Sequence, residues 1–185
     1  MARSGGALFD AMAALRDARD PGVPGIDLAT LNGGDTDLVI EALVGALVPP
    51  NGDADRIRVA MQEVLSEALV GMEEFDFSRI ADDIIVDMVL AYVTQCIYEQ
   101  IVLDSRDAFA KATAAGRVEQ AEKAMRELVR SAADKHMAPL LTGNVRTLNG
   151  HVVEMAQLRA IADIWAEWGV GAMTAFRPMV LKHQT

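Results

Sequence analysis

The residues best suited to hold a metal ion are three neighbouring aspartates, Asp82, Asp83 and Asp87. On a helix, Asp83 and Asp87 are one turn apart, which places two carboxylates on one face. A metal ion needs about four to six converging ligands, and the same aspartates could equally form the solvated edge of a buried helix. We favour the solvated edge and keep a metal-dependent helical enzyme, using Asp83, Asp87 and a histidine, as an alternative.

The histidines and the single cysteine are the other groups that could bind a metal or attack a substrate. His151 and Glu154 have the spacing of a ligand pair, but in the reverse order of the Glu-x-x-His motif of helical metal proteins. His136 is predicted near a helix end, where a cation complements the dipole, and His183 lies in the tail. Cys96 lies in an apolar stretch, which predicts a buried, inert thiol. Nothing reads as a triad, so we assign no catalytic, cofactor-binding or metal residue.

Three glycine clusters were candidates for a phosphate-binding loop: Gly5-Gly6, Gly33-Gly34 and Gly169-x-Gly171. A phosphate-binding loop follows a strand and leads into a helix, and its P-loop form ends in Lys-Ser or Lys-Thr. No cluster precedes such a pair and no predicted strand leads into any of them. We therefore predict no phosphate site and no cofactor.

The charge balance argues against nucleic acid as a direct partner. The chain has 27 acidic and 17 basic residues and a formal net charge of −10, and a net acid repels phosphate. One predicted helix carries a basic cluster interleaved with acids, namely Arg117, Glu119, Glu122, Lys123, Arg126, Glu127 and Arg130. We interpret this cluster as a solvated helix face with ion pairs.

Composition also bears on the compartment. A single cysteine allows no internal disulfide and no zinc or redox motif built from cysteine pairs, so we expect a cytoplasmic protein. Residues 1–20 include three aspartates and lack the continuous apolar core of a signal peptide. Residues 84–103, the most apolar stretch, are interrupted by acidic and amide residues. We therefore expect no membrane span there, but a helix buried by its neighbours.

The elements that must position these residues are all predicted to be helices, because apolar residues recur at helical spacing along the chain. Glycine- and proline-bearing loops separate the helices. The predicted helices cover residues 5–19, 36–48, 54–70, from 76–78 to 103, 117–138 and 147–168, and residues 104–115 either extend the fourth helix or form their own. This order predicts an all-α fold, a single compact bundle or orthogonal array of about six helices without a sheet. One domain spans residues 1–185.

The same spacing predicts which faces are buried. The fourth helix carries apolar residues on several sides and is expected to be central. Leu38 is assigned to the core face of the second helix, and Leu128 to that of the fifth. On the last helix we assign Val152 and Met155 to the buried stripe. The ten methionines fall mostly on such stripes and are interpreted as core.

The last helix also carries both tryptophans, Trp165 and Trp168. Buried, they would anchor the helix, and exposed, they would form an interaction hot spot. We favour burial of Trp165. Gly169 and Gly171 are expected to end the helix, which leaves residues 174–185 as a flexible tail.

Three segments carry a family resemblance. Leu31-Asn32-Gly33 precedes the second predicted helix, which ends in Ala46-Leu47-Val48-Pro49-Pro50-Asn51-Gly52-Asp53-Ala54-Asp55 before an amphipathic run from Arg56 to Leu69. Later come Ile97-Tyr98-Glu99-Gln100-Ile101 and Ile164-Trp165-Ala166-Glu167-Trp168. These segments resemble the helical part of the QatB-like family, in which a leucine-rich helix ends in a turn with proline, glycine and an acid. An arginine-bearing helix follows there, matched by Arg56 or Arg58. The resemblance covers residues 27–110 best.

The resemblance implies a role in bacterial defence. QatB-like proteins are components of Qat anti-phage systems, whose other components are similar to an ATPase, a QueC-like nucleotide-modifying enzyme and a TatD-like nuclease. By this resemblance, the chain is a non-enzymatic subunit that acts through contacts with those proteins. The matching motifs are turn and packing signatures, so no site residue is carried over. The chain departs from the family at Met1-Ala2-Arg3-Ser4, where the family has a longer N-terminal region with an early glycine.

Two alternatives of other classes stand beside this hypothesis. A homo-oligomeric helical scaffold or regulatory protein would explain the wide apolar coverage of residues 84–103, because a second copy could cover surplus apolar surface. The metal-dependent enzyme is the other. The interaction hypothesis differs from both in predicting an exposed apolar patch or groove for a partner protein.

Overall fold

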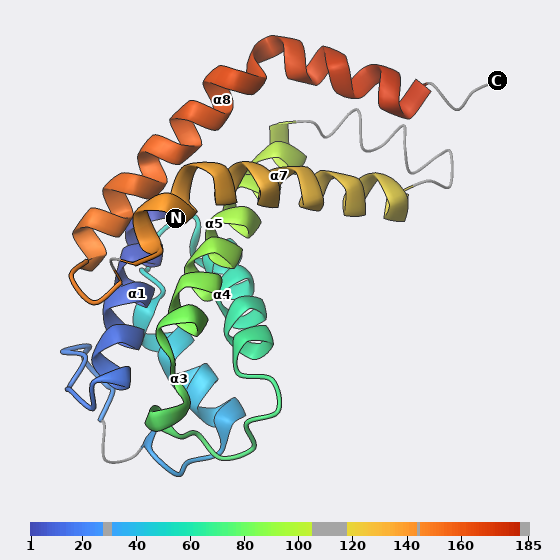
Figure 1. Ribbon diagram of the computed structural model, residues 1–185. Helices are drawn as coiled ribbons and strands as arrows, with labels where there is room; N and C mark the ends of the chain where they lie inside the picture. Colours follow the sequence, from blue (N-terminus) through green and yellow to red (C-terminus); the bar gives the residue numbers. More distant parts are fainter. Residues whose placement is uncertain (28–30, 105–117, 144, 182–185) are drawn as a thin grey trace.

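The computed structural model describes residues 1–27, 31–104, 118–143 and 145–181, with side chains described except at 104, 118, 120, 121, 165 and 167–181. This part of the chain forms six α-helices and one 3-10 helix (Figure 1). They are α1 (Ala2–Arg16), α3 (Thr36–Leu47), α4 (Ala54–Ala68), η1 (Phe77–Arg79), α5 (Asp82–Asp104), α7 (Val118–Leu141) and α8 (Gly150–Leu181). It contains no strand, only an isolated bridge between Asp35 and Glu74. The all-α prediction is confirmed, whereas the helix expected over residues 104–115 lies almost wholly outside the described residues.

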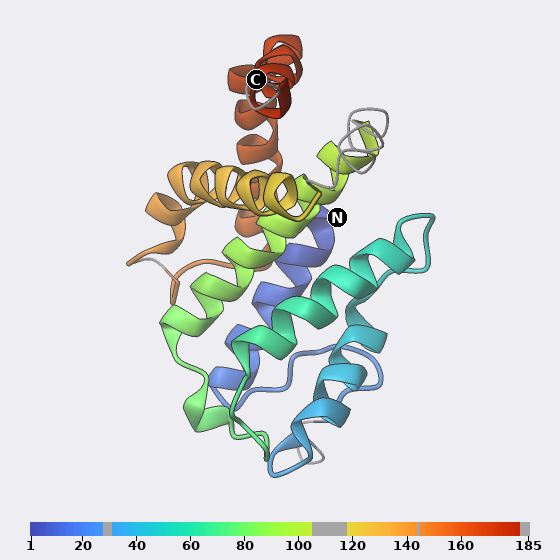
Figure 2. The same cartoon turned by 90° about the vertical axis from the view of Figure 1, so that its right-hand side faces the viewer.

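Helix α5 is the centre of the fold. It packs against α1, α4 and α7, while α8 packs against α1 and α7. Figures 1 and 2 show α5 running through the middle of the molecule, with α3 and α4 on one side and α8 along α1. Its buried side chains point in several directions, as predicted: Ile85, Met88, Val89, Leu90, Tyr92, Val93, Cys96, Ile97, Tyr98 and Ile101.

Helix α5 begins later than predicted, and a short polar turn explains why. The Asp76 carboxylate accepts hydrogen bonds from the backbone N–H and the hydroxyl of Ser78 (2.8 and 2.7 Å) and so caps the 3-10 helix η1. The backbone then becomes extended at Ile80. The chain re-enters a helix only at Asp82, so the predicted start at 76–78 is wrong because the Asp76 cap serves a separate short helix.

The Leu31-Asn32-Gly33 motif ties two loops together below the helices. The Gly33 N–H donates to the Phe75 carbonyl and the Phe75 N–H donates to the Gly34 carbonyl, both at 2.8 Å. The Asn32 side chain accepts from the Phe77 N–H at 3.4 Å. Gly33 has a positive φ of 76°, a conformation that glycine adopts without steric cost. This motif therefore serves the fold.

The predicted end of the last helix is wrong. Helix α8 continues through Gly169 and Gly171 as far as Leu181, so much of the segment expected to be a flexible tail, residues 174–185, is helical. A glycine inside a helix costs only about 1 kcal/mol, and neither glycine is followed by a proline within the next few residues that would stop the helix sooner. Figure 1 shows α8 rising along α1 and then bending over the top of the molecule.

Two assignments to the core are also wrong. Leu38 and Leu128 are exposed, whereas Leu43 on α3 and Val129 on α7 are buried as their helices pack inward. Each exposed leucine lies on a side of its helix that no described element covers. The sequence analysis therefore assigned too many positions of these two helices to the buried face.

One helix among the described residues, Asp82–Leu103, is long and apolar enough to cross a membrane by length and composition. However, 67% of its most apolar window is buried inside the protein. Such burial is what a core helix requires.

Candidate interaction surface on the last helix

Glycines bring α8 unusually close to α1. A methyl group in place of a hydrogen on Gly6 would lie 2.3 Å from the carbonyl oxygen of Gly150, and one on Gly150 would lie 2.3 Å from that of Gly6. A methyl group on Gly5 would meet the side-chain amide of Gln157 at 2.2 Å. The Gly5-Gly6 cluster therefore has a packing role, since only glycine allows the two backbones to approach this closely.

Polar contacts fix where α8 begins. The Asp10 carboxylate on α1 accepts a hydrogen bond from the Gly150 N–H at 2.6 Å. The Asn149 side chain accepts from the Val152 N–H at 3.0 Å. A carboxylate at a helix N-terminus satisfies a free N–H and complements the helix dipole. Together with the glycines, these contacts set the rotation of α8 about its own axis.

That rotation leaves an apolar face of α8 in solvent. The inward positions are occupied by Val153, Gln157, Ala160 and Ile164, which are buried. On the opposite side, Val152, Met155 and Leu158 are 38%, 52% and 47% exposed. We define the α8 outer face as Val152, Met155, Leu158, Ala162 and Ala166, all of which are exposed.

The burial predicted for Val152 and Met155 is therefore wrong. The helix is turned so that Gly150 and the amide of Gln157 face α1, and those polar or small residues give no apolar signal in the sequence. The missed signal was the Gly5-Gly6 pair, since adjacent glycines inside a helix indicate a close approach by another backbone.

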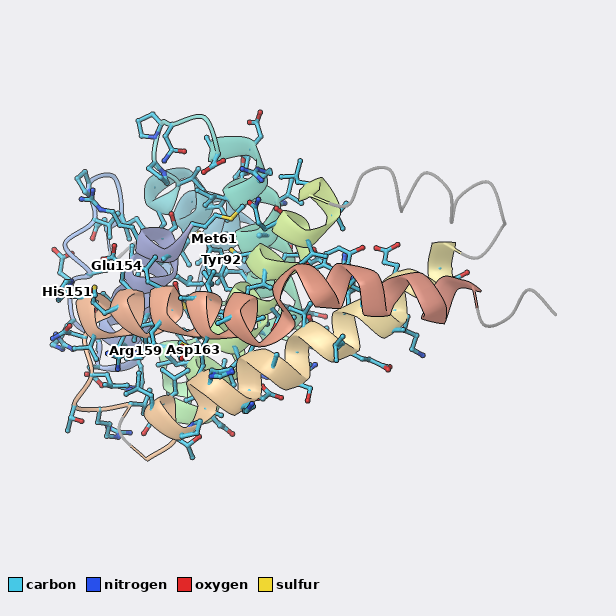
Figure 3. The ribbon with its side chains drawn as sticks, turned by 90° about the horizontal axis from the view of Figure 1, so that it is seen from above. Met61, Tyr92, His151, Glu154, Arg159 and Asp163 are labelled. Carbon is cyan, nitrogen blue, oxygen red and sulfur yellow. The ribbon has the colours of Figure 1, made fainter. Side chains whose placement is uncertain are left out.

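Charged and polar residues lie both on and beside the outer face, since the exposed residues His151 and Arg159 stand one turn before and one turn after Met155. Figure 3 shows Glu154 on one edge of α8 and Arg159 and Asp163 on the edge toward α7. Glu154 lies 3.9 Å from the His151 Nδ1 atom, and Asp163 lies 3.8 Å from the His136 Nδ1 atom. Viewed down on α8, no other described element lies over the helix (Figure 3).

The three aspartates considered as metal ligands do not converge, and one of them, Asp82, binds two arginines instead. The two Asp82 oxygens accept from the Arg16 Nη1 and the Arg146 Nε atoms, each at 2.7 Å. Asp83 accepts from the adjacent Ile84 N–H at 2.9 Å, and Asp87 is exposed. Nowhere in the described part of the chain do three His, Cys, Asp or Glu residues come together as a metal would need. These residues give the metal-dependent alternative no geometric support.

Cys96 is buried, as predicted, against the Tyr92 side chain. Burial raises the pKa of its thiol to about 12, although a hydrogen bond with Tyr92 acts in the opposite direction. The nucleophile is the thiolate, so this thiol is chemically inert in the native fold.

His183 and Arg117 lie outside the described residues, as do the side chains of Trp165 and Trp168.

Labelling of Cys96 with a thiol-specific disulfide reagent at pH 8 should be at least about 100-fold slower in the native protein than in concentrated guanidinium chloride. The reason is that reaction requires both exposure and ionisation of the thiol. Absorbance of the released thiolate follows the rate. Labelling as fast in the native protein as in the denaturant would show that the thiol is accessible.

The basic cluster on α7 is paired with acids where the structure describes it. Arg126 donates to the Gln95 side chain and, at 3.4 Å, to Glu122, and its guanidinium lies 4.2 Å from the centre of the Tyr98 ring. The Gln95 amide in turn donates to Glu99 at 3.1 Å. The interpretation as an ion-paired face is confirmed for Arg126. A shallow groove of about 530 Å³ runs beside it between α4 and α7.

The Glu99→Gln variant is expected to be more stable than the wild type at pH 7. Burial raises the pKa of the Glu99 carboxyl, and one of its oxygens is buried without a partner among the described residues. Because the pKa of Glu99 is higher in the folded protein than in the unfolded chain, the charged carboxylate destabilises the fold. The free energy of unfolding of the wild type therefore falls as the pH rises from about 4.3, the usual glutamate value, through the folded-state pKa. Urea unfolding at pH 7 and pH 4 should therefore show a gain for Glu99→Gln that disappears at pH 4.

Glu67→Gln is the control for this comparison because Glu67 is exposed on the neighbouring helix α4. It should change the free energy of unfolding little at either pH. A Glu99→Gln variant less stable than the wild type at pH 7 would mean that the carboxylate is required in its charged form.

The sequence model of a family described as Qat anti-phage system associated protein QatB matches residues 1–166. The chain belongs to the QatB family. The match is longer than the resemblance over residues 27–110 and includes α1 and the first half of α8. No curated protein and no solved structure matches the chain. This QatB-family chain is thus a component of the Qat anti-phage defence system.

Proposed function

We propose that this QatB-family chain is a non-enzymatic, protein-binding component of its Qat system and that a partner protein docks on the α8 outer face. The observation that carries the proposal is the exposure of Val152, Met155 and Leu158 on one side of a helix held firmly by α1. Clustered exposed apolar side chains on a rigid element mark binding surfaces. Methionine is enriched at the centres of such interfaces.

The chemistry of this surface suits a protein better than a nucleic acid. The chain has a net charge of −10, and the outer face is mostly apolar. Nucleic-acid binding depends on neutralising phosphates with Lys and Arg, and Arg159 is the one arginine or lysine on this face among the described side chains. Apolar residues on one face of a helix instead fit a hydrophobic groove or helix on a protein.

The surroundings of the side chains that could be reactive support a non-enzymatic role. Among the described residues, Cys96 is buried, Asp82 is bound by two arginines, and His136 and His151 each lie beside a carboxylate. We propose that the proteins bound are the other components of the system, of the ATPase-like, QueC-like or nuclease-like kind, and that they meet the chain in the cytoplasm.

The test is affinity purification of the tagged chain co-expressed with the other proteins of its system, read by mass spectrometry. The wild type should recover at least one of them in stoichiometric amount. A Met155→Asp, Leu158→Asp double variant should recover at least about tenfold less, which corresponds to roughly 1.4 kcal/mol of binding free energy.

Leu128→Asp is the matched control because Leu128 is also an exposed leucine, but on α7. Circular dichroism should show that all variants fold alike. Equal recovery of the partner by the double variant and the wild type would contradict docking on the α8 outer face. Failure of the wild type to recover any partner would count against the interaction role itself.

A further inference from the structure

The chain contains three Asn-Gly pairs: Asn32-Gly33, Asn51-Gly52 and Asn149-Gly150. In such a pair the backbone nitrogen of glycine can attack the side-chain amide carbon of asparagine, because glycine has no Cβ to hinder the approach. The attack requires a glycine N–H that is not held by an acceptor and a backbone that can leave its folded conformation. The structure distinguishes the three pairs by these two requirements.

The pair Asn32-Gly33 is held between two loops. The Gly33 N–H donates to the Phe75 carbonyl at 2.8 Å, and the Asn32 side chain accepts from the Phe77 N–H at 3.4 Å. Both bonds join segments that are far apart in sequence. The Gly33 nitrogen can therefore reach the Asn32 amide only if these tertiary contacts open first.

The pair Asn149-Gly150 is held at the contact between α1 and α8. The Gly150 N–H donates to the Asp10 carboxylate at 2.6 Å, and the Asn149 side chain accepts from the Val152 N–H at 3.0 Å. The Gly150 backbone also lies so close to Gly6 that an added methyl group would be 2.3 Å from the Gly6 carbonyl oxygen. Attack at Asn149 therefore requires α8 to separate from α1.

The pair Asn51-Gly52 has no such restraint. Both residues are exposed in the turn between α3 and α4, and the Gly52 N–H donates to no acceptor among the described residues. The Asn51 oxygens accept only from within the turn, the side chain from the Asp53 N–H at 2.9 Å and the carbonyl from the Ala54 N–H at 3.0 Å. An exposed turn of this kind opens locally at little cost in free energy.

We infer that Asn51 is a site of spontaneous deamidation in the folded protein. The Gly52 nitrogen loses its proton to solvent and forms a bond to the Asn51 Cγ atom, and the side-chain nitrogen leaves as ammonia. Water then opens the resulting five-membered succinimide at either carbonyl, which yields aspartate or isoaspartate. One water is consumed and one ammonia is released for each Asn51 converted, and nothing is oxidised or reduced.

Either product changes the start of α4. The new carboxylate lies two residues before Asp53, the N-cap of that helix, where the helix dipole favours a negative charge. The aspartate form therefore keeps the fold. The isoaspartate form adds one atom to the backbone, so the bonds from the Asp53 and Ala54 N–H groups to residue 51 lose their geometry. This inference is independent of docking on the α8 outer face.

Peptide mapping of the purified full chain tests the inference. The protein is incubated at pH 8 and digested at mildly acidic pH, and mass spectrometry with chromatography separates the asparagine, aspartate and isoaspartate forms of each peptide. Asn51 should be converted at least about tenfold faster than Asn32 and Asn149. In concentrated guanidinium chloride the three rates should agree within about threefold, because all three pairs are then free of tertiary contacts. A native Asn51 rate no faster than the other two would overturn the inference.

Gly52→Ala tests the attacking atom. An added methyl group on Gly52 meets nothing within 4 Å, and its φ does not lie in the left-handed region, so this variant should fold like the wild type. Its Cβ should slow conversion of Asn51 at least about tenfold by hindering the approach of the nitrogen. Gly45→Ala, which also meets nothing within 4 Å, should leave the Asn51 rate unchanged. Conversion as fast in Gly52→Ala as in the wild type would overturn attack by the Gly52 nitrogen.

Discussion

Replacing Gly6 by alanine is expected to lower the free energy of unfolding by about 2–3 kcal/mol. The added methyl group would lie 2.3 Å from the Gly150 carbonyl oxygen. That oxygen belongs to the backbone, so no side-chain rotation can relieve the contact, and α8 must move away from α1. Movement of α8 would also lengthen the hydrogen bond between Asp10 and the Gly150 N–H. Urea unfolding followed by circular dichroism gives the difference directly.

Two other glycines serve as controls for the Gly6→Ala variant. Gly45 lies inside α3, where an added methyl group meets nothing within 4 Å. Gly45→Ala should therefore stabilise the protein by about 0.5–1 kcal/mol through helix propensity. Gly5→Ala should cost less than Gly6→Ala, because its methyl group meets only the movable end of the Gln157 side chain. Equal stability of Gly6→Ala and the wild type would refute the close approach of α1 and α8.

Replacing Arg16 by methionine is expected to lower the free energy of unfolding by about 2 kcal/mol at pH 7. The Arg16 side chain is only 8% exposed and bonds to both Asp17 and Asp82, at 2.8 and 2.7 Å. Methionine keeps most of the apolar stem of arginine, so the decrease in the free energy of unfolding measures the contribution of the guanidinium group. Arg19→Met, which removes an exposed partner of Asp17, should cost at most about 0.5 kcal/mol.

The pH dependence of the Arg16→Met effect has a definite sign. The Arg16 and Arg19 guanidinium groups hold the pKa of the Asp17 carboxyl far below its usual range. A lowered pKa contributes stability above the unfolded value, about 3.9, and that stability is lost as the pH falls toward the folded value. The difference between wild type and Arg16→Met should therefore shrink below about pH 4. A difference that grows on acidification would contradict this account.

The general fold follows from the sequence because helical spacing is a local property. The buried residues of α4, for example Ile57, Met61 and Val64, recur at one face of an ideal helix. The cap at Asp35 is likewise local: its carboxylate accepts from the Asp37 and Leu38 N–H groups, and aspartate is among the residues preferred at a helix N-cap. Burial on several sides of α5 followed from its wide apolar coverage.

Features that depend on which helices meet were not predictable in the same way. Helix α8 has apolar residues on both its inward and outward sides, so spacing alone could not choose between them. The choice was made by Gly6 and Gly150, whose closeness appears only when α1 and α8 pack. Likewise, Asp82 is bound by Arg16 and Arg146, which are distant in sequence, and no local pattern could reveal that pairing.

The sequence therefore predicted that an exposed apolar surface exists, but it did not locate that surface on α8. The interaction hypothesis required an exposed apolar patch, and the patch consists partly of residues that spacing had assigned to the core. Packing within the described fold does not account for Val152 and Met155, which are exposed. The binding role that we propose for the outer face of α8 would account for them.

The most direct test of the central proposal is protection against phage in cells that carry the complete Qat gene set. Two versions of this chain should be compared at equal expression: Met155→Asp, Leu158→Asp on the α8 outer face, and Asp83→Asn, Asp87→Asn at the carboxylates first considered for a metal. Loss of protection in the α8 variant, with protection retained in the carboxylate variant, is the predicted result. Protection retained in the α8 variant but lost in the carboxylate variant would contradict a protein-binding role and favour chemistry at Asp83 and Asp87.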